Sequence, residues 1–456
     1  MVTAAPTSLS GATRELAAFA SGLTYDQLPP PVLREARRCL VDFLGTALGG
    51  SSHPVVDVLL RAAAGWQTAP QATVLGRTSR VDLLAAALVN GAMAHVHDFD
   101  DTHLASIVHP TSPLWPAILA LAEVRGGALP GKRWLAAFVA GFEVECRVGA
   151  AAYPSHDAGA YHATGIFGPL GAAAACSNLL GMSAEQTAMT MSVAASQAAG
   201  LRAQFGTMTK SFHVGNASRS GLMAALLVEQ GLDASPSPIE AERGLLTTFA
   251  PVERRPEALT QRLGSDFQIL HNSVKPYSCG VVTHPLIDSV IKLRREHGLE
   301  PQQVAQIEAE VHPLVLNLTG KQDPRVGLEG KFSAYHCAAA ALVDGVCGPE
   351  QFTDARVLDR TVADLRRRVR LNANPDIKEH EAEVAITLVD GRCLTIHIPF
   401  HQGTPENPVT DEALQAKFTS LANLSLPPDR AAAIVSTVDR VDDLTSPEPL
   451  LALCRP

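Results

Sequence analysis

The sequence predicts a mainly α-helical protein with a smaller α/β (α+β) domain inserted near its carboxyl end. Apolar residues spaced three and four positions apart recur from the amino terminus to about residue 260, and β-branched alternation appears only after about residue 266. Polar helical sequence returns from about residue 407. A chain of 456 residues is too long for one ordinary core. We therefore expect a large helical domain formed from both termini, residues 1–266 and 407–456, and a smaller domain at residues 267–406.

The helical part opens with Leu16, Phe19, Ala20 and Leu23 on one face. Aromatic residues make up only 5% of the chain and alanine is abundant, which favours closely packed helices over a β-sandwich. Several later segments are apolar on nearly every side, as is typical of helices in the centre of a domain. These helices are expected at Val81–Met93, Pro113–Arg125, Lys132–Ala150, Gly168–Leu180, Ala184–Gln197 and Ser218–Glu229.

The smaller domain mixes helical and strand patterns. Residues 306–311 and 382–388 alternate in polarity, and Asp390-Gly391 marks a hairpin turn into a partner strand at residues 393–398. This predicts an α/β domain with an antiparallel element. Its helical patterns lie at Thr283–His297, Phe332–Gly345 and Asp359–Val369.

Composition excludes several classes of function. A net charge of -9 argues against binding to nucleic acid or an anionic membrane, because both need a basic field. The eight cysteines show no CxxC pair, which fits a reduced, cytoplasmic setting. The amino-terminal segment lacks the pattern of a secretory signal, and no run of eighteen apolar residues suggests a membrane span. We therefore expect a cytoplasmic protein that binds neither nucleic acid nor membrane.

The densest polar cluster is HVHDFDDTH at residues 95–103, with His109 just beyond it. Two functional interpretations compete. His95 and His97 with a neighbouring carboxylate offer metal ligands, whereas a carboxylate beside an imidazole is typical of proton transfer near neutral pH. The metal interpretation is weaker, because the preceding residues are helical and side chains two apart on a helix point to different sides. For His95 and His97 singly, a structural role is favoured.

Four further segments carry polar residues among apolar ones. His162 and Thr164 precede an alanine-rich helix whose first N–H groups suit a carboxylate. Lys210 lies three residues before His213 among Thr, Met and Phe residues, which is typical of a buried ammonium that faces an anion or transfers a proton. Lysines also mark KPYSCG at residues 275–280 and EGKFS at residues 329–333, and neither segment has the full Walker pattern.

Read together, these motifs resemble the MmgE/PrpD family, and the resemblance covers nearly the whole chain. Its members include 2-methylcitrate dehydratase, cis-aconitate decarboxylase and iminodisuccinate epimerase. The segments that carry it are VNG (89–91), DFDDT (98–102), His109-Pro110, Tyr161-His162, MTK (208–210) with His213, KPY (275–277) and EGKFS (329–333).

The resemblance implies a helical domain, a lid-like α/β domain, a cleft between them and a homodimer formed through the helical part. It also implies catalysis without metal or organic cofactor. Matched position by position, the expected catalytic residues are Asp98, His109, His162, Lys210 and Lys275. The expected substrate-binding residues are His103, Thr164, His213, Tyr277 and Lys331.

The sequence departs from two branches of that family. The decarboxylase branch carries a histidine where Gly280 stands here, which makes decarboxylation less favoured. The epimerase branch carries a tyrosine before the histidine matching His162, and the nearest position here is Asp157, so Tyr153 or Tyr161 would have to substitute.

The leading hypothesis is a cofactor-independent lyase that removes an α-proton from a small polycarboxylic acid and eliminates water, as 2-methylcitrate dehydratase does. His162 is the expected base, with His109 or Asp98 completing the relay, and Lys210 and Lys275 would neutralise the developing charge. An epimerase of a dicarboxylic amino-acid derivative such as iminodisuccinate is the main alternative. A metal-dependent hydrolase built on residues 95–103 and a non-catalytic carboxylate-binding protein complete the hypotheses.

Overall fold

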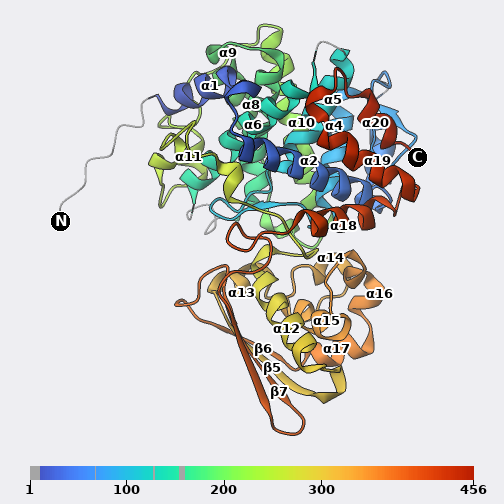
Figure 1. Ribbon diagram of the computed structural model, residues 1–456. Helices are drawn as coiled ribbons and strands as arrows, with labels where there is room; N and C mark the ends of the chain where they lie inside the picture. Colours follow the sequence, from blue (N-terminus) through green and yellow to red (C-terminus); the bar gives the residue numbers. More distant parts are fainter. Residues whose placement is uncertain (1–10, 67, 127–128, 154–159) are drawn as a thin grey trace, which may run out of the picture.

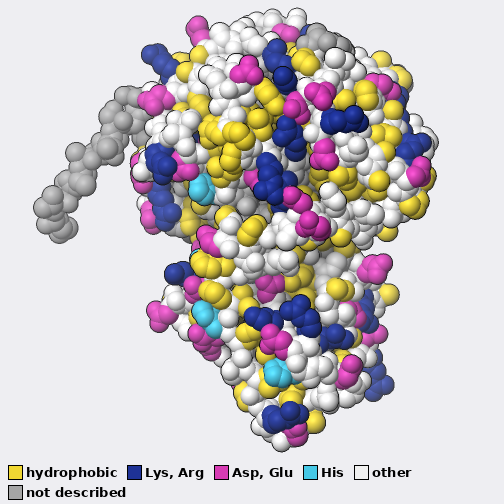
Figure 2. Space-filling view, viewed as in Figure 1, with side chains coloured by type: hydrophobic (Ala, Val, Ile, Leu, Met, Phe, Trp, Pro, Cys, Tyr) yellow, Lys and Arg dark blue, Asp and Glu magenta, His cyan; other side chains and the backbone are white. Residues whose placement is uncertain are grey.

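A computed structural model describes residues 11–66, 68–126, 129–153 and 160–456. It confirms a mainly helical protein with a smaller α/β part (Figure 1). Figure 2 shows two lobes that meet at a narrower waist. The larger lobe holds α1 (Ala12–Gly22), α2 (Pro30–Gly50), α3 (Pro54–Ala64), α4 (Leu83–His95), α5 (Thr111–Arg125), α6 (Gly131–Ala152), α8 (Ala163–Leu180), α9 (Ala184–Ala195), α10 (Met208–Glu229), α11 (Leu245–Phe249), α18 (Asp411–Ala422), α19 (Pro428–Asp439) and α20 (Glu448–Leu453).

The smaller lobe is built on a four-stranded sheet in the order β6-β5-β7-β8. β5 pairs with β6 in parallel, whereas β7 pairs antiparallel with both β5 and β8. The hairpin expected at Asp390-Gly391 is confirmed, with Thr387 paired to Cys393 and Gly391 at a φ of 90°. The elements of this lobe are α12 (His284–His297), β5 (Val304–Val311), α13 (Pro313–Thr319), α14 (Gly327–Gly330), α15 (Ala334–Asp344), α16 (Asp354–Val357), α17 (Arg360–Arg366), β6 (Val369–Ala373), β7 (Ala382–Leu388) and β8 (Cys393–Ile398).

The two lobes have separate apolar cores. The first extends from α1 to Val274 and resumes at Val409, and the second runs from Tyr277 to the end of β7. Phe267 and Val274, which the sequence assigned to the smaller domain, therefore pack in the helical core.

Close helix packing positions the site in the larger lobe. Gly215 of α10 lies against the backbone of α4, where a Cβ atom would stand only 2.1 Å from the Leu88 carbonyl oxygen. Any larger residue would therefore push the two helices apart. The same approach brings Lys210, at the start of α10, within 2.7 Å of His95 at the end of α4.

α8 is the one helix in the described residues that is long and apolar enough to cross a membrane. Inside the protein, 94% of it is buried, between α6, α9 and α10. Core helices of globular proteins pass the same test, so the apolar character of α8 is explained by its central position.

Three element boundaries differ from those expected by three residues or more. α8 begins at Ala163 rather than Gly168, and α10 begins at Met208 rather than Ser218. The helix expected at Asp359–Val369 was wrong at its carboxyl end, because α17 stops at Arg366 and Val369 opens strand β6.

A short antiparallel pair, β3 (Thr102–His103) with β4 (Asn272–Ser273), joins the loop after α4 to the segment that leads into the smaller lobe. Lys417 of α18 reinforces it, because its ammonium donates to the carbonyl oxygens of Phe99 at 2.6 Å and Lys275 at 3.0 Å. The same ammonium lies 2.7 Å from a carboxylate oxygen of Asp42 in α2. Segments that are far apart in the sequence thus meet at the waist.

Candidate active site

The loop after α4 places Asp98 at the centre of the site. Asp98 has a φ of 49°, a left-handed conformation that Asp tolerates better than most residues. Its N–H donates to the His95 carbonyl oxygen at 2.9 Å, which turns the chain back on the end of the helix. The Asp98 side chain, 4% exposed, therefore points into the protein rather than along a solvated loop.

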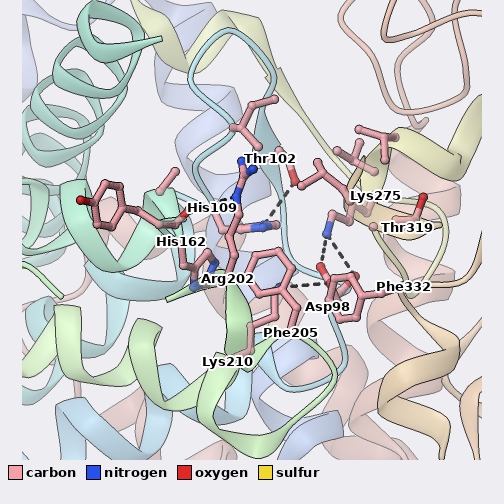
Figure 3. A pocket seen from close by; sticks show the side chains of 17 residues that line it. Asp98, Thr102, His109, His162, Arg202, Phe205, Lys210, Lys275, Thr319 and Phe332 are labelled. Carbon is pink, nitrogen blue, oxygen red and sulfur yellow. Dashed lines mark hydrogen bonds and ion pairs between the residues drawn. The ribbon is translucent and has the colours of Figure 1, made fainter. Parts of the chain in front are cut away.

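Two buried ammonium groups share the Asp98 carboxylate. Lys210 lies 3.1 Å from one oxygen and Lys275 lies 2.5 Å from the other, and Figure 3 shows them approaching from two sides. Burial alone would raise the pKa of the Asp98 carboxyl, but the two lysines hold it well below its usual range. Burial lowers the pKa of Lys210, and Asp98 opposes that change. Asp98 is therefore an anion that fixes two cations.

Two imidazoles complete the polar floor. His109 donates from Nδ1 to the Asp101 carbonyl oxygen at 2.8 Å, so its neutral ring presents Nε2 as an acceptor. His162, the N-cap residue of α8, has Nδ1 3.2 Å from Nδ1 of His213. Its Nε2 is buried and has no hydrogen-bond partner among the described residues. Burial lowers the pKa of both His109 and His162 well below the ordinary value, so both rings are neutral bases at neutral pH.

These groups line one pocket between the lobes (Figure 3). The structure brings together all the residues that the sequence assigned to catalysis, which are Asp98, His109, His162, Lys210 and Lys275. The facing wall comes from the smaller lobe and is mostly apolar. Its residues are Gly280, Val281, Val282, Leu318, Thr319 and Phe332.

Three of the expected substrate-binding residues lie behind the floor of the pocket. The His103 ring contacts the Ser106 hydroxyl at 2.7 Å. Thr164 accepts a hydrogen bond from the His109 N–H at 3.0 Å, and His213 contacts His162. Thr164 and His213 thus support the two imidazoles of the pocket, and direct contact of His103, Thr164 and His213 with substrate stays a prediction.

The remaining two expected substrate-binding residues, Tyr277 and Lys331, make contacts within the smaller lobe and between the lobes. Tyr277 donates from its hydroxyl to Asp288. Lys331 is buried and donates to the carbonyl oxygens of His97 at 2.7 Å and Ser278 at 2.9 Å. Lys331 therefore joins the two lobes beside the pocket, and its binding of substrate also stays a prediction.

Several pocket residues were not expected from the sequence. Arg202 and Phe205 lie in the short segment before α10, and Thr102 follows the acidic cluster. Tyr161, a possible substitute for the epimerase tyrosine, lines the pocket, whereas Tyr153 donates to Glu379. Asp157 lies outside the described residues.

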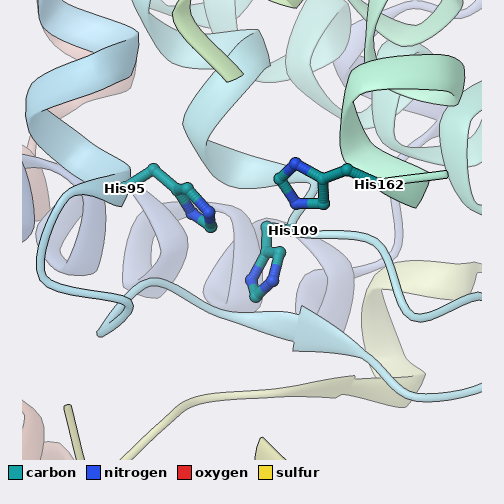
Figure 4. Close-up of side chains that lie close together, drawn as sticks. All are labelled: His95, His109 and His162. Atoms are coloured by element: carbon teal, nitrogen blue, oxygen red, sulfur yellow. The ribbon is translucent and has the colours of Figure 1, made fainter. Parts of the chain in front are cut away.

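The cluster of His95, His109 and His162 does not fit a resident metal ion, and His97 lies apart from it. His97 turns away and contacts the Gly49 carbonyl oxygen at 3.1 Å, which separates the expected pair. His95, His109 and His162 do converge, with ligand atoms within 4.8 Å of one another (Figure 4). However, Nε2 of His95 already accepts from the Lys210 ammonium at 2.7 Å, and that positive charge opposes a metal cation.

Both halves of the chain match one family of proteins. Residues 14–256 match the MmgE/PrpD N-terminal domain and residues 277–443 match the MmgE/PrpD C-terminal domain. This chain belongs to the MmgE/PrpD family. The gap between the two family matches contains β4 and Lys275, at the waist between the lobes.

Several characterised proteins are similar over almost their full length. Cis-aconitate decarboxylase of Mus musculus is 28% identical, and the match covers 96% of this chain and 92% of the mouse protein. The Homo sapiens enzyme of the same name is 28% identical, with 96% and 93% covered. That of Aspergillus terreus is also 28% identical, with 97% and 96% covered. This MmgE/PrpD chain is therefore similar to these relatives over nearly the whole of both sequences.

Proposed function

We propose that this protein is a cofactor-independent lyase that removes a proton beside a carboxylate of a small polycarboxylic acid and eliminates water. The observation that carries the proposal is the pair of buried ammonium groups on Asp98 in the same pocket as two neutral imidazoles. Cations fixed before the reaction stabilise an enediolate without reorganising. Neutral imidazoles supply the base at neutral pH.

Each lysine keeps one donor for the substrate. An ammonium group has three N–H bonds. Within the described part of the chain, Lys210 uses two of them on His95 and Asp98, and Lys275 uses two on the side chain and carbonyl oxygen of Asp98. The third N–H of Lys275 is expected to bind a carboxylate of the substrate, and the third N–H of Lys210 is expected to face the departing hydroxyl.

The proposed reaction assigns one task to each group. Nε2 of His162 takes the α-proton, and the electron pair of that C–H bond moves into the adjacent carboxylate, which Lys275 holds. Return of the pair forms the C=C bond and breaks the C–O bond. Lys210 gives a proton to the departing hydroxyl, which leaves as water, and Nε2 of His109 accepts a hydrogen bond that orients this hydroxyl.

Proton NMR in D2O tests the proposal directly. Purified protein is incubated with 2-methylcitrate, citrate, cis-aconitate and iminodisuccinate, with and without a chelator. Formation of an unsaturated acid from one of the hydroxy acids, unaffected by the chelator, is the expected result. Deuterium uptake into recovered substrate without loss of water would replace the lyase with an epimerase.

Decarboxylation is the second candidate, because the similar proteins named above are cis-aconitate decarboxylases. The apolar wall of Val281, Val282 and Leu318 also suits a carboxylate that is lost as CO2, because desolvation disfavours its charge. Against it stands Gly280, which lines the pocket without a side chain where the decarboxylase branch carries a histidine. Release of CO2 from cis-aconitate in the same assay would favour this candidate.

A further inference from the structure

We infer that His95 and Asp100 form a positioning pair that holds the Lys210 ammonium in place for its role as the proton donor. Neither residue lines the pocket, so neither reaches a substrate except through Lys210. The catalytic consequence rests on the proposed lyase function. The pair itself is a feature of the hydrogen bonds and can be tested without turnover.

The Asp100 carboxylate fixes the protonation of the His95 ring. Asp100 is 1% exposed and accepts from the Ser112 hydroxyl at 2.6 Å and from Nδ1 of His95 at 2.8 Å. A carboxylate can only accept here, so Nδ1 carries the hydrogen and Nε2 keeps its lone pair. That lone pair receives the Lys210 ammonium at 2.7 Å. In the opposite tautomer, the N–H at Nε2 of His95 would point at an N–H of the Lys210 ammonium.

Several charged groups face Lys210, and they set its pKa together. Burial lowers that pKa, Asp98 and Asp100 raise it, and Lys275 lowers it. The Phe205 and Phe332 rings lie 5.2 Å and 5.1 Å from the ammonium. The titratable groups around Lys210 are His95 on α4, Asp98 and Asp100 on the following loop, His109 before α5, His162 before α8, His213 on α10 itself and Lys275 after β4.

Asp100→Asn is the decisive substitution. It keeps the shape, but an amide nitrogen can donate to Nδ1 of His95, which moves the ring hydrogen to Nε2, where it faces Lys210. We expect kcat to fall roughly 10- to 100-fold, the loss of one charge-assisted hydrogen bond, while KM changes less than about 3-fold. The alkaline limb of the kcat profile should move to lower pH, because Lys210 loses both an acceptor and a nearby negative charge.

A second substitution distinguishes an effect on the His95 tautomer from a general disturbance of the site. His95→Gln places an amide oxygen near the position of Nε2, and a glutamine has no tautomer to reverse. In the His95→Gln background, Asp100→Asn should lower kcat less than about 3-fold, so the two changes are strongly non-additive. Ser112→Ala is the matched control, because it removes the hydroxyl that donates to Asp100 without changing the His95 tautomer.

Neutron diffraction from crystals grown in D2O provides the readout that does not need turnover. The expected result is deuterium on Nδ1 and none on Nε2 of His95. Deuterium on Nε2, an equal effect of Asp100→Asn in both backgrounds, or an unmoved alkaline limb would overturn the inference. If Asp100→Asn does not fold, the wild-type tautomer and the activity of His95→Gln still decide it. If the wild type converts none of the acids, the proposed function fails, while the neutron result still judges the pair.

Discussion

Replacing Asp98 with asparagine should cost about 3–5 kcal/mol of folding free energy at pH 7, because it removes the shared partner of a buried ion pair. The Asp98 side chain is 4% exposed, and those of Lys210 and Lys275 are 7% and 1% exposed, so water cannot replace the lost carboxylate. Asparagine keeps the size of the side chain and tolerates the φ of 49° at this position. The cost should therefore reflect charge rather than shape.

The sign of the pH dependence follows from the lysines. Burial already lowers the pKa of Lys210, and without Asp98 that pKa falls further. A lysine whose folded pKa lies below its unfolded value binds fewer protons when folded, so stability rises with pH up to the unfolded value. The difference between wild type and Asp98→Asn should shrink from pH 7 to pH 10. It should also shrink below about pH 4, where wild-type stability is lost as Asp98 itself becomes protonated.

Urea unfolding followed by circular dichroism at several pH values measures this difference. Asp101→Asn is the matched control. Asp101 is buried and forms no ion pair with a lysine among the described residues, and burial raises its pKa to about 7. The contribution of Asp101 to stability is present below about pH 4 and is lost as pH rises through about 7. Its substitution should therefore change the free energy of unfolding over a different pH range from that of Asp98→Asn. A loss below about 1 kcal/mol for Asp98→Asn, or a loss that is constant from pH 5 to pH 10, would refute the ion-pair reasoning.

Three further predictions concern activity. His162→Ala should lower kcat roughly 10²–10⁴-fold, and a steady-state assay that finds near-wild-type turnover would remove His162 from the reaction. Burial keeps the pKa of His109 and His162 well below 6.5, so kcat/KM should persist below pH 6.5, and an acid limb centred at 6.5 or higher would contradict neutral imidazoles. Prolonged dialysis against a chelator should leave activity unchanged, because Lys210 occupies Nε2 of His95, and activity restored by zinc would show otherwise.

Local signals predicted much of the fold. The β7–β8 turn follows from Asp390-Gly391, because a type of turn that needs positive φ selects those residues. The first turns of α8 were not predicted, because Gly165 and Pro169 ordinarily interrupt helices. Packing explains the exception at Gly165, where a Cβ atom would lie 2.4 Å from the Ala199 carbonyl oxygen. β6 was also missed, because its pairing with β5 joins segments far apart in the chain.

The sequence predicted which residues form the pocket better than it predicted how those residues contact one another. Residue types and motif order found the residues of the pocket floor, yet His95 was given a structural role because a helix-end histidine has no local sign of its partner. That partner, Lys210, lies 115 residues later. Tyr277 and Lys331 were placed in substrate binding because they belong to motifs, and motifs also contain residues that hold the structure together. Tyr277 donates to Asp288 within the smaller lobe, and Lys331 joins the two lobes.

The three contacts of the Lys417 ammonium affect the order in which parts of the chain fold during synthesis. Asp98 emerges during synthesis long before Lys275, which is 177 positions away, and Lys417 follows 142 positions after that. A nascent chain that ends before α18 has no cation to join Asp42, Phe99 and the Lys275 carbonyl. We expect such a chain to leave the Asp98 loop exposed to proteases, and the loop to become resistant only when the carboxyl-terminal helices dock.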